Sequence, residues 1–124
     1  MEVTSQTSDL EQIHDWKGSI DSVRDAIRSM RSQLEQITLQ KTDDESRIQI
    51  EHFQNQFIRQ MEVADELHHD LRQSAKKIMN NGQLIVLHDD RPIDNPDVLQ
   101  DRMHMFMKLY NELEKEFTVF ISFS

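Results

Sequence analysis

The sequence predicts an all-α protein, an antiparallel up-down-up bundle of three long helices, and three observations lead to this fold class. The 124 residues include 2 Gly and 2 Pro, too few for the many turns of a β-sandwich or barrel. Apolar residues recur at alternating steps of three and four along three stretches, which is the heptad pattern of packed helices. Turns separate those stretches, so we expect a single domain over 8–124 that follows a disordered N-terminus over 1–7.

The first predicted helix covers about 8–39. Ser8 and Glu11 match a capping box, in which a hydroxyl and a carboxylate accept hydrogen bonds from backbone N–H groups at a helix start. The apolar residues that follow occupy successive a and d positions, and this arrangement requires a helical partner along the whole length. The predicted seam consists of Ile13, Trp16, Ile20, Val23, Ile27, Met30, Leu34 and Ile37.

The second predicted helix covers about 43–80 and opens on another capping box, Thr42 with Glu45. Because only a short turn separates it from the first helix, the two are expected to be antiparallel neighbours. Gln60 and Ser74 interrupt its seam with polar side chains, and Gly82 is expected to end the helix. The apolar seam positions are Ile50, Phe53, Phe57, Ala64, Leu67, Leu71 and Ile78.

The third predicted helix covers about 96–121, with Asn95 as N-cap and Pro96 at the first helical position. The preceding loop, 83–95, contains the apolar run Leu84-Ile85-Val86-Leu87, which we expect to cover one end of the bundle. Met105 is expected to face away from the seam. The seam itself consists of Leu99, Met103, Phe106, Tyr110, Leu113, Phe117 and Phe120.

Charge and composition exclude several functions. The net charge is -9, from 23 acidic against 14 basic residues, and each third of the chain is acidic, which argues against binding to nucleic acid or to anionic membrane surfaces. The absence of Cys excludes disulfides, thiolate-bound zinc and a cysteine nucleophile. A polar N-terminus and the lack of a long apolar run predict a soluble, cytoplasmic protein without a signal peptide or membrane span.

Two sets of motifs resemble known proteins. The stretch 51–57 running on to 67–70, together with Arg102-Met103, Phe106, Leu109-Tyr110, Glu112-Leu113 and Glu116-Phe117, resembles a family of short uncharacterised bacterial helical-bundle proteins. This similarity covers most of 10–121 and implies a helical bundle without implying an activity. Trp16 on a heptad-patterned first helix is similar to the first helix of a spectrin-type three-helix repeat.

Histidines provide the candidate metal ligands. Glu66 with His69 and Asp101 with His104 have the acid-x-x-His spacing of di-iron bundles, yet their heptad positions place them on solvated faces. Reflection about the predicted turn near residue 41 places His14 level with His68 and His69, with His104 nearby. Imidazoles gathered in this way could bind zinc or nickel, whereas the alternative is a set of exposed histidines on polar faces. The candidate metal ligands are His14, His68, His69 and His104.

These observations predict a non-enzymatic helical interaction module that needs no cofactor and binds a protein partner or its own copy. The alternative is a metal-binding bundle that uses the histidines. A third candidate is a secretion or assembly chaperone, a class that also includes acidic helical proteins. No catalytic motif places a nucleophile on a strained turn. The apolar C-terminus predicts a homodimer with Phe120, Ile121 and Phe123 in the contact, against a monomer whose tail covers its own core.

Overall fold

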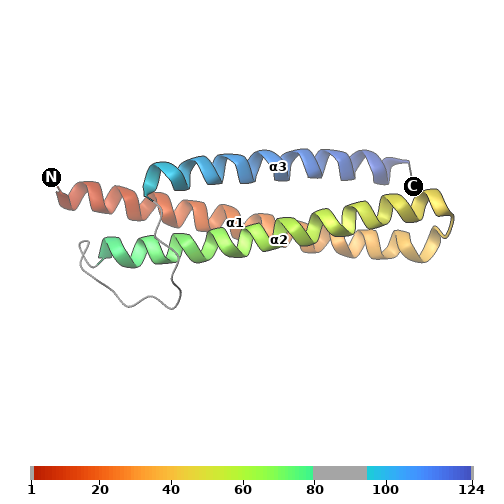
Figure 1. The fold of residues 1–124 in the computed structure, drawn as a ribbon, viewed down its shortest axis with the longest axis horizontal. Helices are drawn as coiled ribbons and strands as arrows, with labels where there is room; N and C mark the ends of the chain where they lie inside the picture. Colours follow the sequence, from red (N-terminus) through yellow and green to blue (C-terminus); the bar gives the residue numbers. More distant parts are fainter. Residues whose placement is uncertain (1, 80–94, 124) are drawn as a thin grey trace.

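The computed structural model describes residues 2–79 and 95–123 of the chain. Within them lie three helices, α1 (Glu2–Gln40), α2 (Asp44–Met79) and α3 (Pro96–Ser122). Figure 1 shows the three helices side by side along one long axis, with α2 running back along α1 and α3 running in the direction of α1 again. The predicted up-down-up three-helix bundle is confirmed.

The start of α1 differs from the prediction. The helix begins at Glu2, so Ser8 and Glu11 lie inside it, and residues 2–7, which the capping pattern places outside the helix, belong to it. No Gly or Pro occurs before Ser8, so no strong helix breaker interrupts the backbone ahead of the predicted cap. A capping-box pattern marks a helix start only where the preceding backbone leaves the helical conformation.

The turn between α1 and α2 is closed by Asp43 rather than by Thr42. The Asp43 Oδ2 atom accepts a hydrogen bond from the backbone N–H of Ser46 at 3.1 Å. This bond is the main reason why the pKa of Asp43 is lowered from 3.8. On the other side of the turn, the Lys41 N–H donates to the Ile37 carbonyl at 2.9 Å and completes the last turn of α1. Because Asp43 is the cap, α2 begins at Asp44.

The start of α3 agrees with the prediction. The Asn95 side chain accepts a hydrogen bond from the Val98 N–H at 3.0 Å, and Pro96 occupies the first helical position. Pro96 has no backbone N–H to satisfy, and its fixed φ suits a helix start. The predicted helix-ending Gly82 and the apolar run 84–87 lie outside the described residues.

The core follows the predicted seams. Every apolar position predicted for the three seams is either buried or partly buried against the core. Trp16, Ile37, Ile78 and Phe120 are the partly buried members of these seams. The polar interruptions Gln60 and Ser74 are also buried, and Gln73 joins them although it lies off the predicted seam. The heptad pattern therefore identified the buried face of each helix.

Four phenylalanines close the core near the α1–α2 turn. Phe53 and Phe57 of α2 meet Phe117 and Phe120 of α3, with ring centroids between 5.0 and 6.3 Å apart. The rings of Phe53 and Phe57 each meet Phe117 edge to face, at an interplanar angle of 75°. Such pairs contribute roughly 0.5–1.5 kcal/mol each beyond the burial of their surface. We call these four residues the phenyl cluster.

Candidate interaction surface

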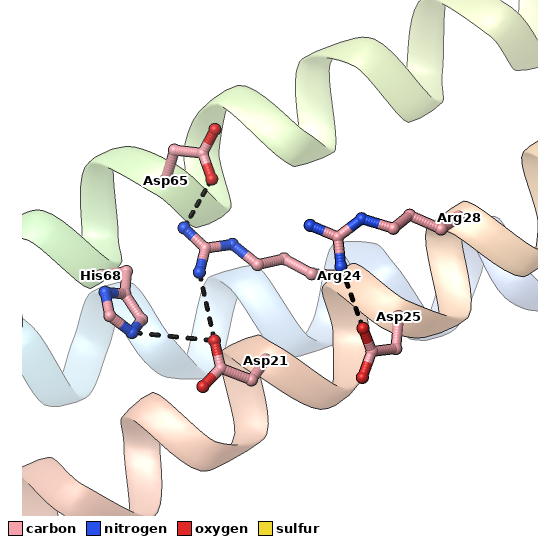
Figure 2. A network of polar contacts seen from close by, with 6 residues as sticks. All are labelled: Asp21, Arg24, Asp25, Arg28, Asp65 and His68. Carbon is pink, nitrogen blue, oxygen red and sulfur yellow. Dashed lines mark hydrogen bonds and ion pairs between the residues drawn. The ribbon is translucent and has the colours of Figure 1, made fainter.

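The flank of α2 that faces α1 carries a network of charged side chains, shown in Figure 2. The Arg24 guanidinium donates to Asp21 on its own helix at 3.1 Å and to Asp65 across the interface at 2.5 Å. His68 of α2 lies 3.7 Å from the same Asp21, and Arg28 pairs with Asp25 along α1. The contacts of Arg24 and His68 span α1 and α2 and pair opposite charges along this part of the flank.

His68 has the least exposed side chain of that network, and it is the one member that ordinarily changes charge near neutral pH. Its side chain is 17% exposed. Burial lowers its pKa from 6.5, and the positive charge of Arg24 lowers it further, while Asp21 acts in the opposite direction. The imidazole is therefore favoured in its neutral form, and the arrangement suits a packed side chain.

The predicted histidine cluster is not assembled. His14 and His104 are exposed, and His69 is half-buried beside Asp70, with its Nδ1 atom 3.2 Å from the carboxylate. Glu66 and Asp101 of the acid-x-x-His pairs also lie at exposed positions. Within 2–79 and 95–123, no group of three or more His, Asp and Glu side chains is placed to hold a metal ion.

The register between α1 and α2 explains why His14 does not meet His68. His68 meets Asp21 rather than His14, and these two α1 positions are seven residues apart, which is about 10 Å along the axis. The reflection about residue 41 treats side chains as if they extended straight out from the helix. Part of this shift arises because each Cα–Cβ bond tilts toward the helix N-terminus, which moves contacts across an antiparallel pair by about one residue on each helix.

The other flank of α2 faces α3. Arg102 of α3 donates to Asp70 of α2 at 2.8 Å, and His52 lies 3.5 Å from Glu116. The Asp70 and Arg102 pair fixes the register of this interface. One heptad further toward the turn on both helices stand Val63 and Leu109, which are 38% and 44% exposed. By the helical repeat, two apolar side chains are therefore level on this flank.

Exposed apolar side chains on α3 lie along one line. Steps of seven, four, ten and four residues connect them, each close to a whole number of helical turns, so they share one face of the helix beside the core seam. Phe123 follows the last residue of α3 as its C-cap and continues the line. We call these five exposed residues the α3 stripe: Val98, Met105, Leu109, Val119 and Phe123.

The predicted interface residues separate at the C-terminal end of the α3 stripe. Phe120 belongs to the phenyl cluster, with its ring centroid 5.0 Å from that of Phe53, and Ile121 is partly buried against the core. Phe123 is 86% exposed. With Val119 and Phe120 it lines an open groove of about 320 Å³ whose other wall consists of Lys41, Glu45, Ser46 and Gln49. Phe123 is thus the most exposed member of the predicted trio, and Phe120 and Ile121 are partly buried.

Sequence reasoning identified part of the α3 stripe. Met105 was expected to face away from the seam, and it is 52% exposed. Val98, Leu109 and Val119 were overlooked, although the signal was present, because they recur at the c and g positions that flank the seam. The other c and g positions of α3 hold Arg102, Glu112 and Glu116, so this second line is only partly apolar.

Comparisons of the sequence with protein-family models, with curated proteins and with solved structures found no match. The resemblances to bacterial helical-bundle proteins and to a spectrin-type repeat therefore stay predictions. In the described ranges 2–79 and 95–123, no helix combines the length and the apolar character needed to cross a membrane.

Proposed function

We propose that this protein is a non-enzymatic helical interaction module that binds another protein surface, its own copy or a different chain, through the α3 stripe. The observation that carries the proposal is the alignment of five exposed apolar residues on one face of α3. Apolar side chains that gather on one face usually mark an interaction site, and a helix presenting such a line is a common form of helical recognition.

The polar groups with shifted pKa values support the non-enzymatic part of the proposal. Asp43 is a helix cap, and its pKa is lowered by the Ser46 N–H that it caps. Burial and the hydrogen bond to Glu114 raise the pKa of Tyr110 to about 12. His68 belongs to the α1–α2 network. Each shift has a structural cause, and the three residues belong to different parts of the fold: Asp43 to the α1–α2 turn, His68 to α2 and Tyr110 to α3.

The acidic composition supports the remaining parts of the proposal. A net charge of -9 disfavours nucleic acid and anionic membrane surfaces as partners and favours a protein partner. The cytoplasm is the compartment that we propose, because the chain contains no Cys that an oxidising compartment would use for disulfides.

Chemical cross-linking in extracts of cells that produce the full chain tests this function. The test variant combines Met105→Glu with Val119→Glu on the α3 stripe. Its matched control combines Leu39→Glu with Ile48→Glu, which removes two apolar side chains that are 75% and 69% exposed and adds the same charge away from the stripe. Circular dichroism establishes that all three proteins are folded.

We expect the native chain and the control to form the same cross-linked complexes, whether with another copy or with a different protein. The stripe variant should lose them, because an ionised carboxylate in an apolar contact has no solvent to stabilise it. Complexes that survive unchanged in the stripe variant would contradict the proposed function.

A further inference from the structure

The middle of the α3 stripe has an ordered charge pattern. Reading along one flank of α3, a cation is followed by two apolar residues and then by an anion: Arg102, Met105, Leu109 and Glu112. The steps between them are three, four and three residues, so the spacing is the same from either end. The charges at the two ends are opposite. We call these four residues the self-complementary segment.

This segment is accessible and lies beside further apolar surface. Met105 is 52% and Leu109 is 44% exposed, and the Arg102 side chain is 29% exposed. Glu112 is also exposed. Val63 of α2 stands level with Leu109 and is 38% exposed, which widens the apolar centre of the segment onto the neighbouring helix.

A two-fold axis through the middle of this segment matches every residue with a complementary one. Antiparallel pairing of two α3 helices places Met105 of one copy against Leu109 of the other, and Arg102 against Glu112. Parallel pairing would place Arg102 opposite Arg102 and Glu112 opposite Glu112. A two-fold interface requires a surface that complements itself, whereas a different partner protein requires no such symmetry.

We infer that the occupant of this surface is a second copy of the chain, bound antiparallel through the self-complementary segment. This inference rests on the proposed function and names its partner. Arg102 can serve both copies, because a guanidinium has five N–H donors and one of its nitrogens, Nη1, holds Asp70 at 2.8 Å. In the proposed dimer, Arg102 also contacts Glu112 of the other copy. Opposite charges at both ends of the contact offset the repulsion between two chains that each carry -9.

Light scattering over a wide concentration range, with two charge-reversal variants of the full chain, tests this pairing. Glu112→Arg places two arginines opposite each other at both ends of the contact, and Arg102→Glu places two glutamates there. Each variant alone should dissociate at concentrations about tenfold or more above those at which the native dimer dissociates. A mixture of the two should form a heterodimer, because both ends then join an arginine to a glutamate. Lys115→Glu, a charge reversal outside the segment, is the control and should dimerise like the native chain.

The outcomes separate this inference from the proposed function. A native chain that is monomeric at every concentration, or a dimer unaffected by Glu112→Arg, overturns the two-fold pairing. If Arg102→Glu unfolds because Asp70 then faces a carboxylate, Glu112→Arg alone decides the question, since it leaves the contact with Asp70 intact. If the native chain is monomeric but forms a complex with a different protein, and the Met105→Glu, Val119→Glu variant loses that complex, the self-pairing is overturned and the broader function is supported. Loss of neither kind of complex overturns both.

Discussion

The two ends of the bundle differ in the side chains that join their helices. The turn region, residues 30–57 and 113–123, contains the phenyl cluster, and its buried α2 side chains are all apolar. The far region, residues 8–29, 60–79 and 95–112, contains all three buried polar residues of the described chain, Gln60, Gln73 and Ser74. It also contains both arginine-to-aspartate bridges between helices among the described residues.

This contrast separates two tasks that a heptad pattern performs together. Large rings in the turn region bury the most apolar area per residue, so this region supplies a large share of the stability. Polar groups in the far region stabilise the fold less, because their desolvation offsets what their contacts return. A misaligned Arg24 or Arg102 would however lose its aspartate, so these residues favour one alignment of the helices.

The largest effect should come from the turn region. Phe57 is fully buried, and Phe57→Ala should lower the free energy of unfolding by about 3–5 kcal/mol, because it removes a ring and leaves a cavity. Urea denaturation measures this change. The neighbouring Ile58→Ala, at a side chain that is 46% exposed, is the matched control and should cost no more than about 1 kcal/mol. Equal losses at both positions would show that the phenyl cluster does not dominate this end.

In the far region, removal of a buried polar group should stabilise the protein. The Oε1 atoms of Gln60 and Gln73 are buried and accept no hydrogen bond from the described residues. Gln60→Leu should therefore raise the free energy of unfolding by about 1–2 kcal/mol, since an unsatisfied carbonyl is replaced by an apolar group of similar size. Gln54→Leu, at an exposed position of the same helix, is the control. A loss of stability with Gln60→Leu would show that the amide makes a contact that its replacement breaks.

A smaller gain is expected at Gly18 in α1. A methyl group added there meets no atom within 4 Å. Gly18→Ala should stabilise the far region by roughly 0.5–1 kcal/mol, because glycine loses more backbone freedom on entering a helix. Thermal unfolding followed by circular dichroism measures the shift. An unchanged melting temperature would indicate that α1 is not a continuous helix at this position in the unliganded protein.

The smallest effect is a pH dependence within the α1–α2 network. Burial and Arg24 lower the pKa of His68 from 6.5, with Lys17 and Arg72 adding to the effect and Asp21 opposing it. As the pH falls through about 6.5, the unfolded chain binds a proton at this residue before the folded chain does. Stability should therefore decrease below neutral pH and level off once the folded protein is also protonated.

Melting temperatures between about pH 5 and pH 8 check this sign, a range centred on the ordinary pKa of histidine. His68→Gln should flatten part of the decrease, whereas His14→Gln, at an exposed position of α1, should not. If the melting temperature falls more steeply with decreasing pH in His68→Gln than in the native chain, protonation of His68 stabilises the fold.

Much of the fold could be predicted from the sequence, because each helix buries one face and the heptad spacing reports that face directly. Asn95 and Pro96 located the start of α3, since a cap and a proline act on their own local backbone. The first helix start and the cap of α2 were each misplaced by a plausible neighbouring pattern, Ser8 in one case and Thr42 in the other. Short capping motifs recur by chance in polar sequence and do not mark a unique residue.

The candidate site was less predictable, because it depends on how helices align. A shift of two turns between α1 and α2 brings Asp21 to His68 in place of His14, and spacing within one helix contains no information on such a shift. Phe120 was predicted at an interface; its ring packs in the phenyl cluster of its own chain and is only partly buried, and its place in an interface stays a prediction. The exposure of a side chain depends on which residues of other helices pack against it, and the heptad pattern of one helix does not predict those residues.

The three passes of the chain give the bundle a mechanical polarity. Because the number of passes is odd, α1 starts at one end of the long axis and α3 finishes at the other, as Figure 1 shows. A tension applied between Glu2 and Phe123 therefore acts along the axis. It slides the helices past one another, so that successive layers of core side chains share the load instead of separating one after another. The same bundle pulled between Asp43 and Phe123, which lie at one end, would open like a zipper under a smaller force.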